Sequence, residues 1–191
     1  MVSWVLKEWQ VAVTALLQGD TILLLRKGGI REAQGQFSLA AREVLLLPTF
    51  EHQKLNLLKE QFRPLAQPEP SDQPDRVTFE GWAKITHAVV LKAETEVAPL
   101  LPHLVWNEPF VAERLGWQPD RPLYALLLRA YRLESPLVLP RHKRSSGCRS
   151  WVEIDESIAV ENSTPALTEA DYQTQVKAIL TTLSSASSVI S

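Results

Sequence analysis

Cysteine is almost absent from this sequence, since Cys148 is the only one among 191 residues. One cysteine excludes an internal disulfide framework and a cysteine-rich zinc site, and it suits a reducing cytoplasm, which is the location we expect. The chain also lacks any apolar run near the roughly 20 residues needed to cross a bilayer. Its first residues, MVSWVLKEWQ, contain charged side chains within the apolar stretch, which is not typical of a signal peptide. We therefore expect neither a membrane span nor a secretory leader.

An excess of charge of either sign is also missing. The 20 Lys and Arg residues are nearly balanced by 22 Asp and Glu residues. The molecule as a whole is therefore not a polycation, and any binding of nucleic acid has to be local. The 45% of hydrophobic residues is enough for a core. We expect one domain over residues 1–183, with a proline-rich connection at residues 64–75 and a frayed tail at 184–191.

Apolar runs near residues 21, 43, 77, 123 and 151 predict strands. The runs at 21–26 and 43–47 have no polar face, which is typical of strands covered on both sides. The expected fold is α+β: a mixed, largely antiparallel sheet of about five strands, with helices at both chain ends packing on it. Arg129 and Arg132 should lie on opposite faces of the run near 123, because side chains alternate along a strand.

Helical spacing and capping residues predict four helices. The segment 3–18 has Ser3 placed as its cap, and the segment 51–62 follows Thr49. The segment 106–117 has Asn107 as a cap and Gly116 as its C-terminal signal. The last helix, 167–183, has Thr164 or Thr168 as its cap.

The leading functional hypothesis is a site for a phosphate-bearing ligand or nucleic acid. After the first apolar run come Arg26, Lys27, Gly28, Gly29 and Arg31, so cations flank a glycine pair whose backbone N–H groups could point at an anion. Arginine forks match phosphate oxygens, and lysine supplies a point charge.

Further members of this predicted site lie elsewhere in the chain. Thr49 and His52 would add neutral donors after the second apolar run. A basic loop, RHKRSSGCR, would add a second cluster of Arg141, Lys143, Arg144 and Arg149. Neither GxxxxGK[ST] nor GxGxxG is present, and a Lys-Gly-Gly turn after a strand also fits a simple solvated loop.

Aromatic side chains could provide stacking surfaces for bases. Trp9, Trp82 and Trp151 lie in strongly patterned segments, which indicates core packing. Trp106 and Trp117 lie at the two ends of a predicted helix and are the better candidates for exposure.

Two alternative functions remain open. A divergent restriction-endonuclease-like, metal-dependent nuclease would place Glu8 on the first helix. That group also requires an acid-x-Lys pair, which the segment beginning at Glu43 lacks. The usual location of a glutamate is the surface, which is where we expect Glu8. The other alternative is a protein-interaction module that uses the acidic stretch 153–161 and the last helix.

Other chemistry has less support. The four histidines, His52, His87, His103 and His142, have no i,i+4 partner for a zinc helix. Cys148 has cationic neighbours that could lower the pKa of its thiol, but it also fits as a small residue at the entry to a strand. Glu51 beside His52 does not share a helix face with it. We assign no catalytic residue, metal site or cofactor.

Four segments, LLLRKGGIRE, LLLPTFEHQ, RPLYALLLRAYRL and GCRSWVEID, together resemble a family of bacterial proteins well represented in cyanobacteria, the DUF1802 family. The resemblance covers almost the whole chain. It implies a bacterial cytosolic protein of this domain extent, and it implies no catalytic residue.

Overall fold

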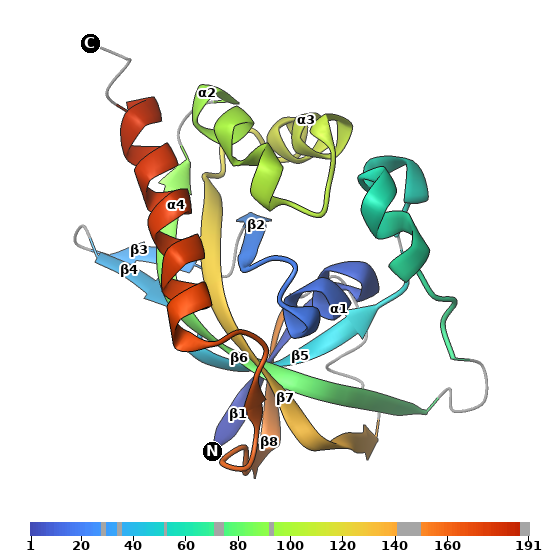
Figure 1. Ribbon diagram of the computed structural model, residues 1–191. Helices are drawn as coiled ribbons and strands as arrows, with labels where there is room; N and C mark the ends of the chain where they lie inside the picture. Colours follow the sequence, from blue (N-terminus) through green and yellow to red (C-terminus); the bar gives the residue numbers. More distant parts are fainter. Residues whose placement is uncertain are drawn as a thin grey trace.

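Figure 1 shows the computed structural model, which describes residues 1–27, 30–33, 36–51, 53–70, 75–91, 94–140 and 150–187. Seven strands of the described chain form one mixed sheet in the order β2-β7-β6-β5-β1-β8, with β9 paired to β7. The strands of this sheet are β1 (Val2–Trp9), β2 (Leu23–Lys27), β5 (Glu43–Thr49), β6 (Arg76–Leu91), β7 (Leu123–Pro140), β8 (Trp151–Ile158) and β9 (Thr164–Pro165). A two-stranded hairpin consists of β3 (Ile30–Ala33) and β4 (Gln36–Leu39).

Strand directions confirm the predicted α+β fold with a mixed, largely antiparallel sheet. In the described sheet, β1 and β5 run parallel, and the other paired strands run antiparallel. All five apolar runs form strands, and the sheet is larger than predicted because it also contains β1 and the short β9. The run near residue 77 is one continuous strand, β6.

Helices pack on this sheet near both ends of the chain. They are α1 (Gln10–Gln18), α2 (Glu94–Val97), α3 (Glu108–Gly116) and α4 (Glu169–Ser187), with the 3-10 turns η1 (Leu55–Leu57), η2 (Glu60–Leu65) and η3 (Ala98–His103). In Figure 1, α4 runs beside the long strands, α2 and α3 lie toward its upper end, and α1 lies nearer the middle. The helix α4 continues to Ser187, past the point where the frayed tail was expected to begin.

The predicted helix 3–18 is wrong in its first half, because residues 2–9 form β1 and only residues 10–18 are helical. Ser3 therefore caps nothing and lies within the strand. The reason is that β1 is paired on both sides, with β5 and β8, and contacts apolar clusters on both faces. Its buried residues, Val2, Val5 and Leu6, then recur at i, i+3 and i+4, which imitates a helix.

The predicted helix 51–62 is also wrong. Residues 55–57 and 60–65 form two short 3-10 turns instead, and Pro64 lies inside the second. Side-chain and backbone contacts from Asn107 hold the first turn: its N–H donates to Leu57 O and its side-chain amide donates to Asn56 O. A segment fixed from outside in this way does not need the hydrogen bonds of a regular helix.

Two predicted helices are confirmed with their caps. In α3 the Asn107 side chain accepts a hydrogen bond from Phe110 N. Before α4, Thr168 Oγ1 accepts one from Asp171 N, so Thr168 rather than Thr164 is the cap. The buried residues of α4 are Tyr172, Val176, Ile179 and Leu183, which lie along one stripe of the helix.

Both arginines of β7 contact protein acceptors. Arg129 forms an ion pair with Glu169 in the first turn of α4. Arg132 donates to Leu17 O near the end of α1, with Nη1 2.8 Å from the oxygen. Both helices contribute to the larger hydrophobic cluster, so the placement of the two arginines on opposite faces stays a prediction.

Two hydrophobic clusters lie on opposite faces of the central strands. In β5, Val44 and Leu46 belong to the larger cluster beneath the helices, whereas Leu45 and Leu47 belong to the smaller one beside β8. The long strand β6 contributes to both. Phe79 belongs to the smaller cluster and Ala83 belongs to the larger one.

Gly81 lies where β6 changes from one cluster to the other. The pairing of β6 with β7 shifts register between Phe79 and Gly81. A Cβ atom at Gly81 would lie 2.3 Å from Tyr131 O and 2.4 Å from Leu17 Cδ2, closer than atoms can approach. Only glycine fits this position, because β7 and α1 both approach the β6 backbone there.

No helix in the described part of the chain is long and apolar enough to cross a membrane.

Candidate phosphate-binding site

The basic segment at the end of β2 begins with an arginine that has a protein partner. Arg26 Nη1 lies 2.6 Å from Glu8 Oε2, and the two side chains are 8% and 2% exposed. The other oxygen of Glu8 accepts a hydrogen bond from Trp9 N at 2.8 Å. The expectation of a surface location for Glu8 is therefore wrong. Glu8 and Arg26 form a buried, hydrogen-bonded ion pair that joins β1 to β2.

Lys27, the next residue, reaches across to the end of α3. Its ammonium lies 2.8 Å from Leu115 O, 2.6 Å from Trp117 O and 3.2 Å from Gln118 O. The three donors thus meet carbonyl oxygens of the last turn of α3 and of the two residues after the helix, and Gln118 O also accepts from Arg121 N. Burial lowers the pKa of Lys27, and the nearby charge of Arg114 lowers it further. Lys27 thus fixes the C-terminal end of α3 over β2. We call the region of Arg26, Lys27, Arg114 and Trp117 the α3 end.

Arg114, in the last turn of α3, is the third cation of the α3 end. Its guanidinium carbon lies 4.9 Å from the centre of the Phe110 ring and 5.9 Å from that of Trp117. Among the described residues, no acceptor lies within hydrogen-bonding or ion-pair distance of this guanidinium. Burial lowers its pKa, the charge of Glu8 opposes this, and the charge of Arg26 adds to it. Arg114 is thus a half-buried cation with its donors unused.

The guanidinium of Arg114 lies beside a cluster of aromatic rings. Trp9, Trp106 and Phe110 form one cluster, in which Trp106 and Phe110 stack with ring centres 4.5 Å apart. Trp106 is fully buried, so its predicted exposure is wrong: it inserts into the core directly before the cap of α3. Trp117 is 50% exposed, as predicted, and it follows the last residue of α3.

Trp9, Trp82 and Trp151 pack against the clusters, as predicted. Trp82 stacks on Tyr131 with ring centres 4.4 Å apart, and its indole N–H donates to Ser163 Oγ. These rings are therefore not stacking surfaces for a ligand.

The other predicted binding residues are placed as follows. Thr49 ends β5 rather than capping a helix, and its hydroxyl donates to Glu8 O at 3.0 Å. Arg31 lies in β3, where its backbone is paired with Ser38. Seven of the predicted residues lie outside the described residues, namely Gly28, Gly29, His52, Arg141, Lys143, Arg144 and Arg149. Whether the two basic loops meet stays a prediction.

Metal chemistry finds no support in the described chain. No group of three or more His, Cys, Asp or Glu side chains there could hold a metal ion. Glu8, the acid required by the nuclease hypothesis, lies at the end of a strand and has both oxygens in use. Cys148 lies outside the described residues. Both the nuclease and the interaction-module hypotheses stay predictions.

Arg114 was not among the predicted binding residues. The sequence does indicate that Arg114 lies beside aromatic rings. It follows Phe110 by four residues and precedes Trp117 by three, and residues at these spacings share a helix face. The sequence does not show that the Arg114 guanidinium lacks an acceptor, because this depends on Glu8 being bound to Arg26. The α3 end has three cations, Arg26, Lys27 and Arg114, and one of them keeps free donors.

The family model described as a domain of unknown function (DUF1802) matches residues 5–178. The chain belongs to this family. No curated protein matches it. Among solved structures, the crystal structure of ASCH from Zymomonas mobilis is 14% identical, with a TM-score of 0.44, and the match covers 91% of this chain and 93% of that one. A point mutant of the same ASCH protein is 12% identical at the same TM-score, with 91% and 94% covered.

Proposed function

We propose that this DUF1802 protein binds a phosphate-bearing ligand at the α3 end, with nucleic acid as the ligand, and that Arg114 and Trp117 make the direct contacts. The observation that carries the proposal is the guanidinium of Arg114. It has no acceptor among the described residues, although a half-buried arginine normally has one. A phosphate oxygen is the acceptor that a free guanidinium fork fits best.

The surrounding charges support an anion at this place. Glu8 neutralises Arg26, while Lys27 and Arg114 have no carboxylate in an ion pair among the described residues. The charges of Asp120 and Glu113 offset those of Lys27 and Arg114 in part, and Glu113 also pairs with Lys54. The positive charge that remains attracts anions over a distance set by the ionic strength. Lys27 contributes through this field, because its ammonium already donates to three carbonyl oxygens.

Trp117 favours a ligand with a flat ring as well as a phosphate. The indole is half exposed and lies beside the guanidinium of Arg114. A base can stack on an exposed aromatic ring without sequence preference, while an adjacent cation binds its phosphate. The cytoplasmic location predicted from the single cysteine agrees with such a ligand and stays a prediction.

Fluorescence anisotropy with a labelled 12-nucleotide single-stranded RNA tests this proposal. We expect the binding constant to fall as salt is raised, because phosphate contacts release counterions. Arg114→Ala should weaken binding about tenfold, as the loss of one charge-assisted hydrogen bond does. It should also reduce the slope of the salt dependence by about one. Trp117→Ala should weaken binding about fivefold or more.

The matched control is Arg76→Ala. Arg76 is an exposed arginine at the opposite end of β6, where it pairs with Pro140, so the charge change is the same and the place is different. Its affinity should equal that of the wild type. Equal affinities of Arg114→Ala and Arg76→Ala would contradict the proposal. So would binding that is insensitive to salt.

A further inference from the structure

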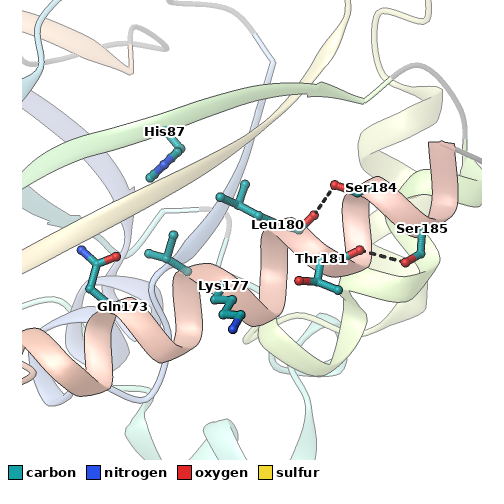
Figure 2. A pocket seen from close by; sticks show the side chains of 8 residues that line it. His87, Gln173, Lys177, Leu180, Thr181, Ser184 and Ser185 are labelled. Carbon is teal, nitrogen blue, oxygen red and sulfur yellow. Dashed lines mark hydrogen bonds between the residues drawn. The ribbon is translucent and has the colours of Figure 1, made fainter.

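A depression lies between β6 and α4, away from the α3 end. Its volume is about 610 Å³, which is within the usual range for small-molecule sites. Figure 2 shows its lining: His87 comes from β6, and the other labelled side chains follow one another along α4. Val176 and Leu180 supply apolar surface, and the remaining lining residues are polar: His87, Gln173, Lys177, Thr181, Ser184 and Ser185.

A bulge in β6 places His87 at this depression. Ile85 pairs with Leu128 and His87 pairs with Leu127, so Thr86 is an extra residue in the ladder. Such bulges redirect side chains and are frequent beside functional sites. Here the bulge brings His87 over α4 (Figure 2).

Hydrogen bonds fix the ring of His87 from one side. Thr86 Oγ1 lies 2.9 Å from His87 Nδ1 and 2.5 Å from the hydroxyl of Tyr172 on α4. If Tyr172 donates to Thr86 and Thr86 donates to Nδ1, each hydroxyl uses its one proton. The longer distance of 3.2 Å from Thr86 Oγ1 to Leu127 O makes that carbonyl the weaker competitor. In this arrangement His87 carries its proton on Nε2, as a donor toward the depression.

The lining is positively charged. No Asp or Glu is among the lining residues, whereas Lys177 is. Within the described chain, the ammonium of Lys177 and the hydroxyl of Thr181 have no hydrogen-bonding partner. In Figure 2 the side chain of Lys177 extends from α4 on the side away from His87. Its four-carbon stem is flexible, so the ammonium can turn toward an anion bound at the depression.

We propose that this depression binds a small organic oxyanion, with its carboxylate or phosphate group on His87 Nε2 and Lys177 and its apolar body against Val176 and Leu180. A volume near 610 Å³ is much larger than an inorganic ion needs, and its apolar surface favours a ligand with a hydrocarbon part. A cationic ligand is disfavoured, because the lining contains Lys177 and no carboxylate. This site is separate from the α3 end and does not depend on the function proposed there.

Nuclear magnetic resonance of the histidine rings tests the proposal with benzoate and phenyl phosphate as probes and benzyl alcohol as the uncharged control. A His87→Gln variant identifies the His87 signals, and the ring nitrogen shifts show which nitrogen carries the proton. We expect saturable shifts of the His87 signals with at least one of the two anions. A response to one alone identifies the preferred group, and a response to both shows that the site takes either.

Lys177→Met should weaken the binding of the responding anion about tenfold, because it removes one charged partner. The matched control is Lys84→Met, which removes an exposed lysine of β6 that does not line the depression, and it should bind as the wild type does. Absence of saturable shifts with both anions would overturn the proposal. Equal binding of benzyl alcohol, or unchanged binding by Lys177→Met, would overturn it as well.

Discussion

The helices α3 and α4 are held to the same sheet by different chemistry. At the C-terminal end of α3 the contact is charged, because the ammonium of Lys27 donates to Leu115 O and Trp117 O. Beside it lies the buried ion pair of Glu8 and Arg26, which joins β1 to β2. Along α4 the contacts are mostly neutral, with a buried apolar stripe and the hydroxyl of Tyr172 on Thr86, and one ion pair joins Glu169 in its first turn to Arg129 of β7. The buried charges of Glu8, Arg26 and Lys27 have partners and hold the fold, whereas Arg114 has no acceptor among the described residues and is available to a ligand.

The ion pair gives the largest expected effect. Glu8→Gln keeps the shape of the side chain but leaves Arg26 buried without a counter-charge, which should cost about 3–5 kcal/mol of unfolding free energy. Urea denaturation followed by circular dichroism measures this loss. A double change, Glu8→Leu with Arg26→Met, removes both charges and should recover most of it. Nearly wild-type stability of Glu8→Gln would show that the ion pair does not hold β1 to β2.

Lys27→Met should have the next largest effect. It removes the three hydrogen bonds to the α3 carbonyls, so we expect a loss of about 1–3 kcal/mol in the same measurement. Lys54→Met is the control, because Lys54 is an exposed lysine that pairs with Glu113 of the same helix. Exposed pairs contribute little, and its loss should stay below about 1 kcal/mol. Equal losses for the two variants would contradict the role given to Lys27.

Tyr172→Phe probes the neutral attachment of α4. Loss of the bond to Thr86 should cost about 1 kcal/mol. Burial raises the pKa of Tyr172, so the folded protein keeps the phenol proton to higher pH than the unfolded chain does. The wild type should therefore lose stability as the pH rises above about 10, the ordinary value for tyrosine. Tyr172→Phe should show a smaller loss over that range, and identical pH profiles would contradict this.

The smallest effect on stability is expected for Arg114→Ala. This change removes only a cation–ring contact, worth about 1 kcal/mol or less, while it should weaken RNA binding about tenfold. Thermal unfolding and anisotropy on the same sample separate the two quantities. A stability loss as large as that of Lys27→Met would show that Arg114 is structural too, and would remove the contrast between partnered and free charges.

Local signals in the sequence were sufficient for some elements and not for others. The helix α3 was predictable because its cap is local: the side chain of Asn107 accepts a hydrogen bond from Phe110 N, three residues later. The strand β1 was not, since it pairs with β5 and β8 and is buried on both faces by apolar clusters whose residues come from distant parts of the chain. Long-range pairing of this kind leaves no period in the sequence of the strand itself.

The candidate site was predicted in part for a similar reason. The sequence marked the basic segment from Arg26 as a binding site, which stays a prediction, but it did not show that Arg26 and Lys27 have protein partners. Glu8 was expected at the surface because a lone glutamate normally is. Its burial depends on an arginine 18 residues away, which sequence spacing cannot indicate.

Because β7 and α1 both approach the β6 backbone closely at Gly81, the number of residues in β6 matters as much as their identity. Val77 and Phe79 before Gly81 contact the smaller hydrophobic cluster, as Trp82 does, whereas Ala83 and Ile85 belong to the larger one. A strand that loses one residue turns all later side chains to the opposite face. Deletion of Glu80 would therefore direct Ala83 and Ile85 away from the helices and turn Lys84 toward them. The fold thus requires a fixed number of residues between the two halves of β6. A single deletion tests this requirement, whereas a substitution does not.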